Sequence, residues 1–178
     1  MRLFQNLDIF GNVLRRKLIN VAELHTEFRD CCIAVGLLFA SQIIAELVWY
    51  RGSVRLNTSA FGITLIWYAY FVALPLLAST LISASRESIG LMLAFLYIQA
   101  GFILLLTFLQ ILGVADIAIV EISLRILRPM LLFLVVCAIL RGPTGIVLLR
   151  GFIFMVLLIG GWFLMAKYLG EPSLFARV

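Results

Sequence analysis

Five long apolar runs, separated by short polar segments, dominate the chain. A helix needs about 20 apolar residues to cross the hydrocarbon core of a bilayer, and each run is long enough. Because the polar connections are short, consecutive helices should be antiparallel neighbours in one bundle. The predicted fold class is therefore an all-α polytopic membrane bundle. Its five transmembrane helices are expected over residues 31–50, 60–83, 89–112, 117–140 and 144–168.

The segment before the first run has a different pattern. Within residues 3–28, apolar side chains recur every three or four positions and charged side chains occupy the other faces, as in an amphipathic helix. A basic segment of this kind favours a helix in the membrane interface, and a short soluble helix docked on the bundle is the alternative. The chain thus divides into an amphipathic cytoplasmic or interfacial segment (1–30), a five-helix transmembrane domain (31–170) and a short tail (171–178).

Composition agrees with a membrane protein. Of the 178 residues, 64% are hydrophobic and 13% are charged, whereas a soluble domain is about a quarter charged. The net charge of +5 comes from basic residues near the helix ends, which favours contact with anionic lipid headgroups rather than with nucleic acid. With one histidine, His25, and no CxxC pair, we expect neither a metal site nor a cofactor.

Arginine and lysine counts predict the orientation. Seven basic residues fall on the N-terminal side of the bundle and four on the opposite side, which favours a cytoplasmic N-terminus in a bacterial inner membrane. The seven are Arg2, Arg15, Arg16, Lys17, Arg29, Arg86 and Arg141, and the four are Arg51, Arg55, Lys167 and Arg177.

The predicted fourth span carries charges inside an apolar run. Glu121, Arg125 and Arg128 have spacings of four and three residues, so they share one helix face, and Pro129 should kink the helix there. A charge at mid-bilayer costs about 2.5–3.5 kcal/mol even on the lenient insertion scale, so this face should point at protein. It forms either a polar cavity for an anionic lipid, a substrate or protons, or a structural lock of paired charges. An interfacial segment over 114–122 is a further alternative.

Other spans contain isolated polar residues. Glu46 lies at a depth that would let it pair with Arg125, and Gln42 lies one turn before it. Arg150 lies about two turns into the last span, where a long side chain can reach the interface.

The third span contains two glutamines. Gln99 and Gln110 are three turns apart on one face, where they either bridge helices by hydrogen bonds or contact a quinone or a lipid headgroup. No nucleophile–base pair is visible in the sequence, so no catalytic residue is assigned.

The overall layout resembles the Yip1 family. The segment LDIFGNVLRRKLINVAELHTEFRD is followed by five spans with short loops, and this match of plan covers most of the chain. The resemblance implies a membrane-organising or trafficking-associated protein without enzymatic activity. The GTPase-linked role of eukaryotic members is not implied, because their long soluble N-terminal region is missing here.

Two functions follow from these patterns. The first is a Yip1-like, non-enzymatic scaffold or accessory subunit of a membrane complex, whose partners are membrane lipids and other subunits or a second copy of itself. The second is a small transporter or channel, in which Glu46, Glu121, Arg125 and Arg128 line a polar path.

Overall fold

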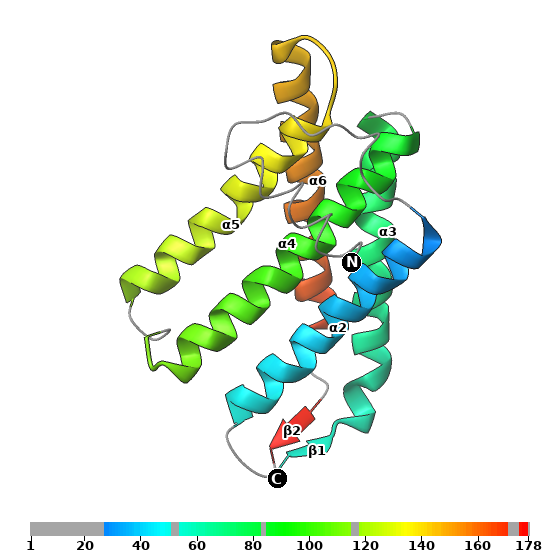
Figure 1. The fold of residues 1–178 in the computed structure, drawn as a ribbon. Helices are drawn as coiled ribbons and strands as arrows, with labels where there is room; N and C mark the ends of the chain where they lie inside the picture. Colours follow the sequence, from blue (N-terminus) through cyan, green and yellow to red (C-terminus); the bar gives the residue numbers. More distant parts are fainter. Residues whose placement is uncertain (1–26, 51–53, 83–84, 115–117, 171–174, 178) are drawn as a thin grey trace.

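A computed structural model of the chain contains five long helices packed side by side (Figure 1). It describes residues 27–50, 54–82, 85–114, 118–170 and 175–177. All five helices are long and apolar enough to cross a membrane, so the predicted five-span, all-α bundle is confirmed. The elements are α2 (Phe28–Tyr50), β1 (Val54–Leu56), α3 (Thr58–Ile82), α4 (Ser85–Ile111), α5 (Ala118–Ile139), α6 (Thr144–Leu169) and β2 (Phe175–Arg177).

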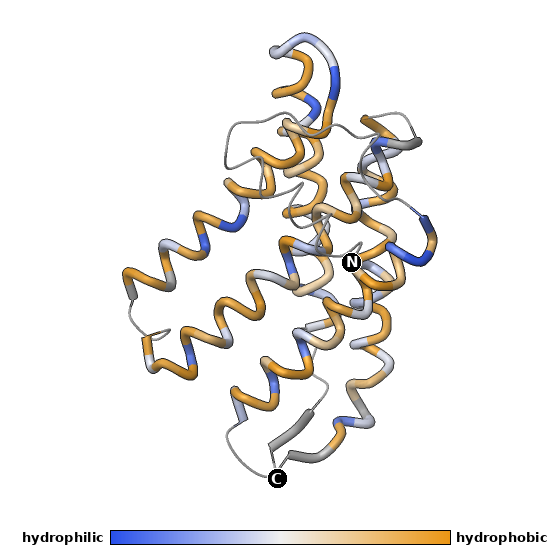
Figure 2. The backbone as a smooth tube through the Cα atoms, in the orientation of Figure 1, coloured by the Kyte–Doolittle hydropathy of each residue, from blue (hydrophilic) through white to orange (hydrophobic). Residues whose placement is uncertain are grey.

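Successive helices alternate in direction, so the start of α2 and the α5–α6 turn lie at the same end of the bundle (Figure 1). That turn is short because Gly142 adopts a φ of +138°, a conformation that glycine tolerates and other residues rarely adopt. Figure 2 shows apolar positions along the length of each helix, with hydrophilic positions interrupting α5. The predicted amphipathic helix near the N-terminus precedes the described residues, so it stays a prediction.

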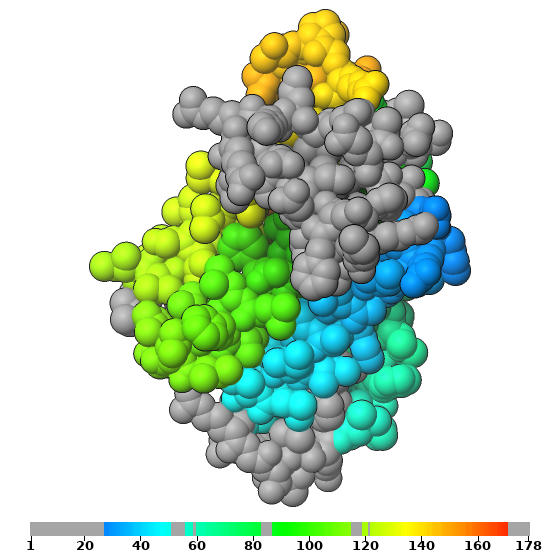
Figure 3. Space-filling view, viewed as in Figure 1, coloured from blue at the N-terminus to red at the C-terminus, as the bar shows by residue number. Residues whose placement is uncertain are grey.

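Helix α4 lies at the centre of the bundle. It packs against α2, α3 and α5, whereas α6 packs against α3 and α5. In its most apolar window, 61% of α4 is buried, compared with 22–28% in the other helices. The helices α2, α4 and α5 lie next to one another across one face of the molecule (Figure 3).

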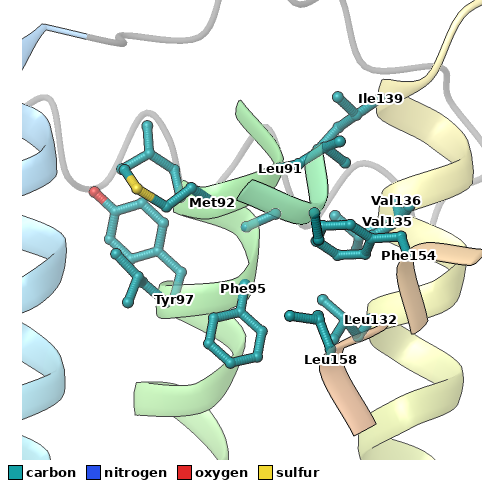
Figure 4. Packing of buried hydrophobic residues seen from close by; sticks show 14 of the residues in the cluster. Leu91, Met92, Phe95, Tyr97, Leu132, Val135, Val136, Ile139, Phe154 and Leu158 are labelled. Atoms are coloured by element: carbon teal, nitrogen blue, oxygen red, sulfur yellow. The ribbon is translucent and has the colours of Figure 1, made fainter. Parts of the chain in front are cut away.

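The hydrophobic core fills the end of the bundle near the α5–α6 turn. Leu91 and Phe95 of α4 face Val136 of α5 and Phe154 of α6, and all four are nearly or fully buried (Figure 4). Glycine lets α5 and α6 meet closely at this end: a Cβ added at Gly151 would lie 2.9 Å from the Sγ atom of Cys137 on α5.

The opposite end is closed by contacts that the sequence did not predict. No strand was predicted in the short tail, yet β2 pairs with β1 in an antiparallel two-stranded sheet, with Leu56 opposite Phe175. Nearby, the indole Nε1 of the fully buried Trp67 donates a 2.9 Å hydrogen bond to the carbonyl of Gly170. These contacts fix the end of α6 against α3 and the α2–α3 connection.

Candidate lipid-binding cavity

A cavity of about 730 Å³ lies between α3, α4, α5 and α6. Its wall is mostly apolar and aromatic, with five side chains that can hydrogen-bond: Tyr70, Gln99, Arg125, Arg128 and Trp162. The other lining residues are Phe71, Leu74, Pro75, Phe95, Ile98, Phe102, Leu106, Leu124, Pro129, Leu132, Met155, Leu158 and Ile159.

The cavity begins where the core ends. Phe95, Leu132 and Leu158 belong to the buried core and also line the cavity (Figure 4). Beyond them α5 and α6 diverge (Figure 1). On the other side, α6 approaches α3 through Gly161, where an added Cβ would overlap the hydroxyl of Tyr70. The absence of a side chain at Gly161 thus lets α6 lie close to α3.

The cavity reaches the bilayer-facing surface of the bundle. Leu106, Ile159 and Trp162 line it, and they are also 38%, 54% and 46% exposed. In a membrane, these exposed apolar side chains contact lipid tails. A hydrophobic molecule can therefore enter the cavity sideways from the bilayer.

Two prolines inside helices also line this cavity. Pro75 interrupts the hydrogen-bond ladder of α3, and Pro129 interrupts that of α5, although both helices continue past them. A proline has no N–H, so the carbonyls of Phe71 and Arg125 lose their usual helical donors.

The two arginines lie about one turn apart on α5. Arg128 is at the middle of α5, about 15 Å from either end of the helix at a rise of about 1.5 Å per residue. Both arginines line the cavity, Arg125 with an exposed side chain and Arg128 with a half-buried one, and the prediction that this face points at protein stays a prediction. Within the described residues, no hydrogen bond or ion pair is made by Arg128.

A second cavity of about 160 Å³ adjoins the first. Arg128, Gln99 and Phe71 line both cavities, so they form the boundary between them. The remaining residues of the smaller cavity are Leu38, Gln42, Tyr68 and Ile103. It is thus the more polar of the two, with four hydrogen-bonding side chains among seven lining residues.

Three buried polar atoms have no hydrogen-bond partner among the described residues, and all three belong to residues that line these cavities. They are the hydroxyls of Tyr68 and Tyr70 and the Oε1 atom of Gln99. An unmade hydrogen bond of a buried group costs about 1–3 kcal/mol. By contrast, Thr107 on α4 is satisfied within its own helix, donating a 2.7 Å bond to the carbonyl of Ile103.

The structure also shows where Gln42 and Glu46, the two polar residues singled out in the first span, lie on α2. Glu46 is buried, at 8% exposure, and the Nε2 atom of Gln42 donates a 2.9 Å hydrogen bond to its carboxylate. Since Gln42 lines the smaller cavity, it connects Glu46 to the polar group around Arg128. The pairing of Glu46 with Arg125 stays a prediction.

The remaining predicted residues lie elsewhere. Gln110, near the end of α4, and Arg150, in α6, are half-buried, and neither lines either cavity in the described structure. Glu121 belongs to α5, but its side chain lies outside what the structure describes. The sequence reasoning missed Tyr68 and Tyr70, because aromatic residues in an apolar span are usually part of the core.

Because the cavity is open to the bilayer, acyl chains can fill its apolar part. Its polar part is formed by the two arginines, by the unpartnered hydroxyl of Tyr70 and by the unpartnered Oε1 atom of Gln99. These groups can bind a molecule that has both a polar group and an apolar chain.

Comparison with known proteins adds no assignment. No protein-family model, curated protein or solved structure matches the chain. The resemblance to the Yip1 family thus rests on layout alone.

Proposed function

We propose that this chain is a non-enzymatic membrane protein that binds an anionic amphiphile taken from the bilayer. The observation that carries the proposal is the pair Arg125 and Arg128 on a mostly apolar cavity of about 730 Å³ that opens toward lipid. Binding pockets for small molecules typically measure about 300–1,000 Å³ and combine an apolar wall with a few polar groups.

The chemistry of the wall favours a phosphate or a carboxylate. A guanidinium donates several hydrogen bonds in a fixed plane and binds such groups in pairs of parallel bonds. At mid-membrane depth the interaction is strengthened, because little water competes with it. The anionic group would lie at Arg125 and Arg128, and the hydrocarbon tail would lie along Phe95, Phe102 and Leu158.

This function is compatible with the wider expectation of a Yip1-like scaffold or accessory subunit. A lipid held between helices can act as a structural component of a larger membrane complex. Purification in mild detergent tests that part of the proposal, since an accessory subunit should elute with a partner in fixed ratio.

Site-specific photo-cross-linking tests the binding proposal. A diazirine amino acid at Leu132, which lines the cavity and is 6% exposed, should capture mainly anionic amphiphile. The matched control is the same amino acid at Leu134, which is 52% exposed on the same helix and should capture lipids in proportion to the membrane composition. Capture of the same lipid mixture at both positions would overturn the proposal.

A small transporter is the second candidate, and the depth of the arginines favours it. Transporters commonly bind their substrates near the bilayer midplane, where Arg128 lies. The hydrogen bond between Gln42 and Glu46 extends the set of polar side chains along α2. In liposomes, a transporter would move a fluorescent anionic lipid between leaflets, and Arg128→Gln would abolish that movement. A protein that only binds lipid would leave the leaflets unmixed.

A further inference from the structure

We propose that the smaller cavity is a headgroup subsite for hydroxyl groups, so that the ligand is an anionic phospholipid with a polyol headgroup of the glycerol type. This inference rests on the proposed function, because it takes the anion to lie at Arg128. It adds the class of headgroup that the cavity selects.

The two cavities are continuous with each other. Arg128 and Gln99 line both, so a phosphate bound at Arg128 would direct its headgroup substituent toward the smaller cavity. That cavity measures about 160 Å³, enough for roughly five water molecules at about 30 Å³ each, and therefore for a short polar substituent. The hydrocarbon tail would remain in the larger, apolar cavity.

The smaller cavity has hydrogen-bonding groups that match an alcohol. The Oε1 atom of Gln99 can only accept, whereas the hydroxyl of Tyr68 can both donate and accept. Both atoms are buried and have no partner among the described residues. A single alcohol group can donate to Gln99 and accept from Tyr68, and so can satisfy both.

Other headgroup chemistries fit less well. A fully ionised phosphate only accepts hydrogen bonds, so it would leave Oε1 of Gln99 without a donor. An ammonium only donates, so it cannot accept from Tyr68, and it would lie beside the positive charge of Arg128. Ordered water could fill the cavity instead, and in that case the protein would not distinguish these headgroups.

The experiment titrates the detergent-solubilised protein with phosphatidylglycerol and with phosphatidic acid of identical acyl chains, and counts bound lipid by native mass spectrometry. Phosphatidic acid carries at least as much negative charge but no alcohol. We expect phosphatidylglycerol to bind about 5- to 10-fold more tightly, as one or two additional hydrogen bonds allow. Soluble glycerol phosphate distinguishes a lipid site from a phosphate site, and it should not compete at the same concentration.

Two tyrosine variants locate the effect. Tyr68→Phe removes the hydroxyl in the smaller cavity and should reduce the preference for phosphatidylglycerol to about one. Tyr168→Phe is the control, because Tyr168 is 74% exposed and lines neither cavity in the described structure. It should keep the wild-type ratio. Each change removes only one hydroxyl group, so the fold should be preserved.

The possible outcomes distinguish a failure of the headgroup subsite from a failure of the proposed function. Equal binding of both lipids to the wild type, with a large loss for each in Arg128→Gln, would overturn the subsite and leave the proposed function intact. A preference that survives Tyr68→Phe would also overturn the subsite. If each lipid binds the wild type and Arg128→Gln with the same affinity, the proposed function itself is wrong.

Discussion

Replacing Arg128 with methionine should make the lipid-free protein more stable and should reduce the additional stability that bound lipid provides. Arg128 lies at mid-membrane depth in α5 and forms no ion pair within the described residues. Burying an arginine there costs up to about 2.5–3.5 kcal/mol, so methionine, which is long and apolar, should relieve about 1–3 kcal/mol of that cost. A binding residue commonly lowers stability in this way.

The second half of the prediction concerns lipid. A hydrogen bond to a charged group contributes about 1.5–3 kcal/mol, and its loss corresponds to roughly 10- to 150-fold in affinity. At a lipid concentration about 100 times the wild-type Kd, binding stabilises the wild type by about 2.7 kcal/mol. A 30-fold weaker variant would gain only about 0.9 kcal/mol under the same conditions.

Denaturation in detergent, with and without phosphatidylglycerol, measures both the stability of the lipid-free protein and the additional stability that lipid provides. Arg150→Met is the matched control, because Arg150 also lies in a span but lines neither cavity in the described structure. It should keep the full stabilisation by lipid. If Arg128 were instead part of a buried structural ion pair, its removal would destabilise the lipid-free protein by about 3–5 kcal/mol. That result would refute the reasoning.

Three further predictions follow from the packing and the charges. Gly161→Ala should destabilise the fold by about 1–3 kcal/mol, because its Cβ would overlap the wall of α3, whereas Gly160→Ala, with nothing within 4 Å, should be neutral or slightly stabilising in a thermal melt. Trp67→Phe should cost about 1–3 kcal/mol in the same assay, since it leaves the carbonyl at the end of α6 without its donor. Reporter fusions at Gly52 and Gly142 should report opposite sides of the membrane, with the second site cytoplasmic; the same side for both would contradict the five-span topology.

The number and position of the helices could be predicted from the sequence because each span is a long apolar run. The observed α2 ends at Tyr50 as expected, and α6 ends at Leu169, one residue beyond the predicted end. That Arg125 and Arg128 share one side of α5 was also predictable from their spacing of three residues, and both line the cavity.

The cavity itself could not be predicted. Its volume depends on where α5 and α6 diverge, and that depends on how Gly151 and Gly161 let neighbouring helices approach. Hydropathy carries no information on such angles. The pairing of β1 with β2 was equally hidden, because strands of three residues, far apart in sequence, have no local signal. Tyr68 looks like a core residue until the space beside its hydroxyl is known.

The central claim is that an anionic amphiphile occupies the cavity at Arg128. Native mass spectrometry of the protein extracted gently from its own membrane tests it most directly. We predict that the wild type retains about one anionic phospholipid per chain and that Arg128→Gln, extracted in the same way, loses it. A wild type that carries no lipid, or a variant that retains the same anionic lipid in the same amount, would contradict the claim.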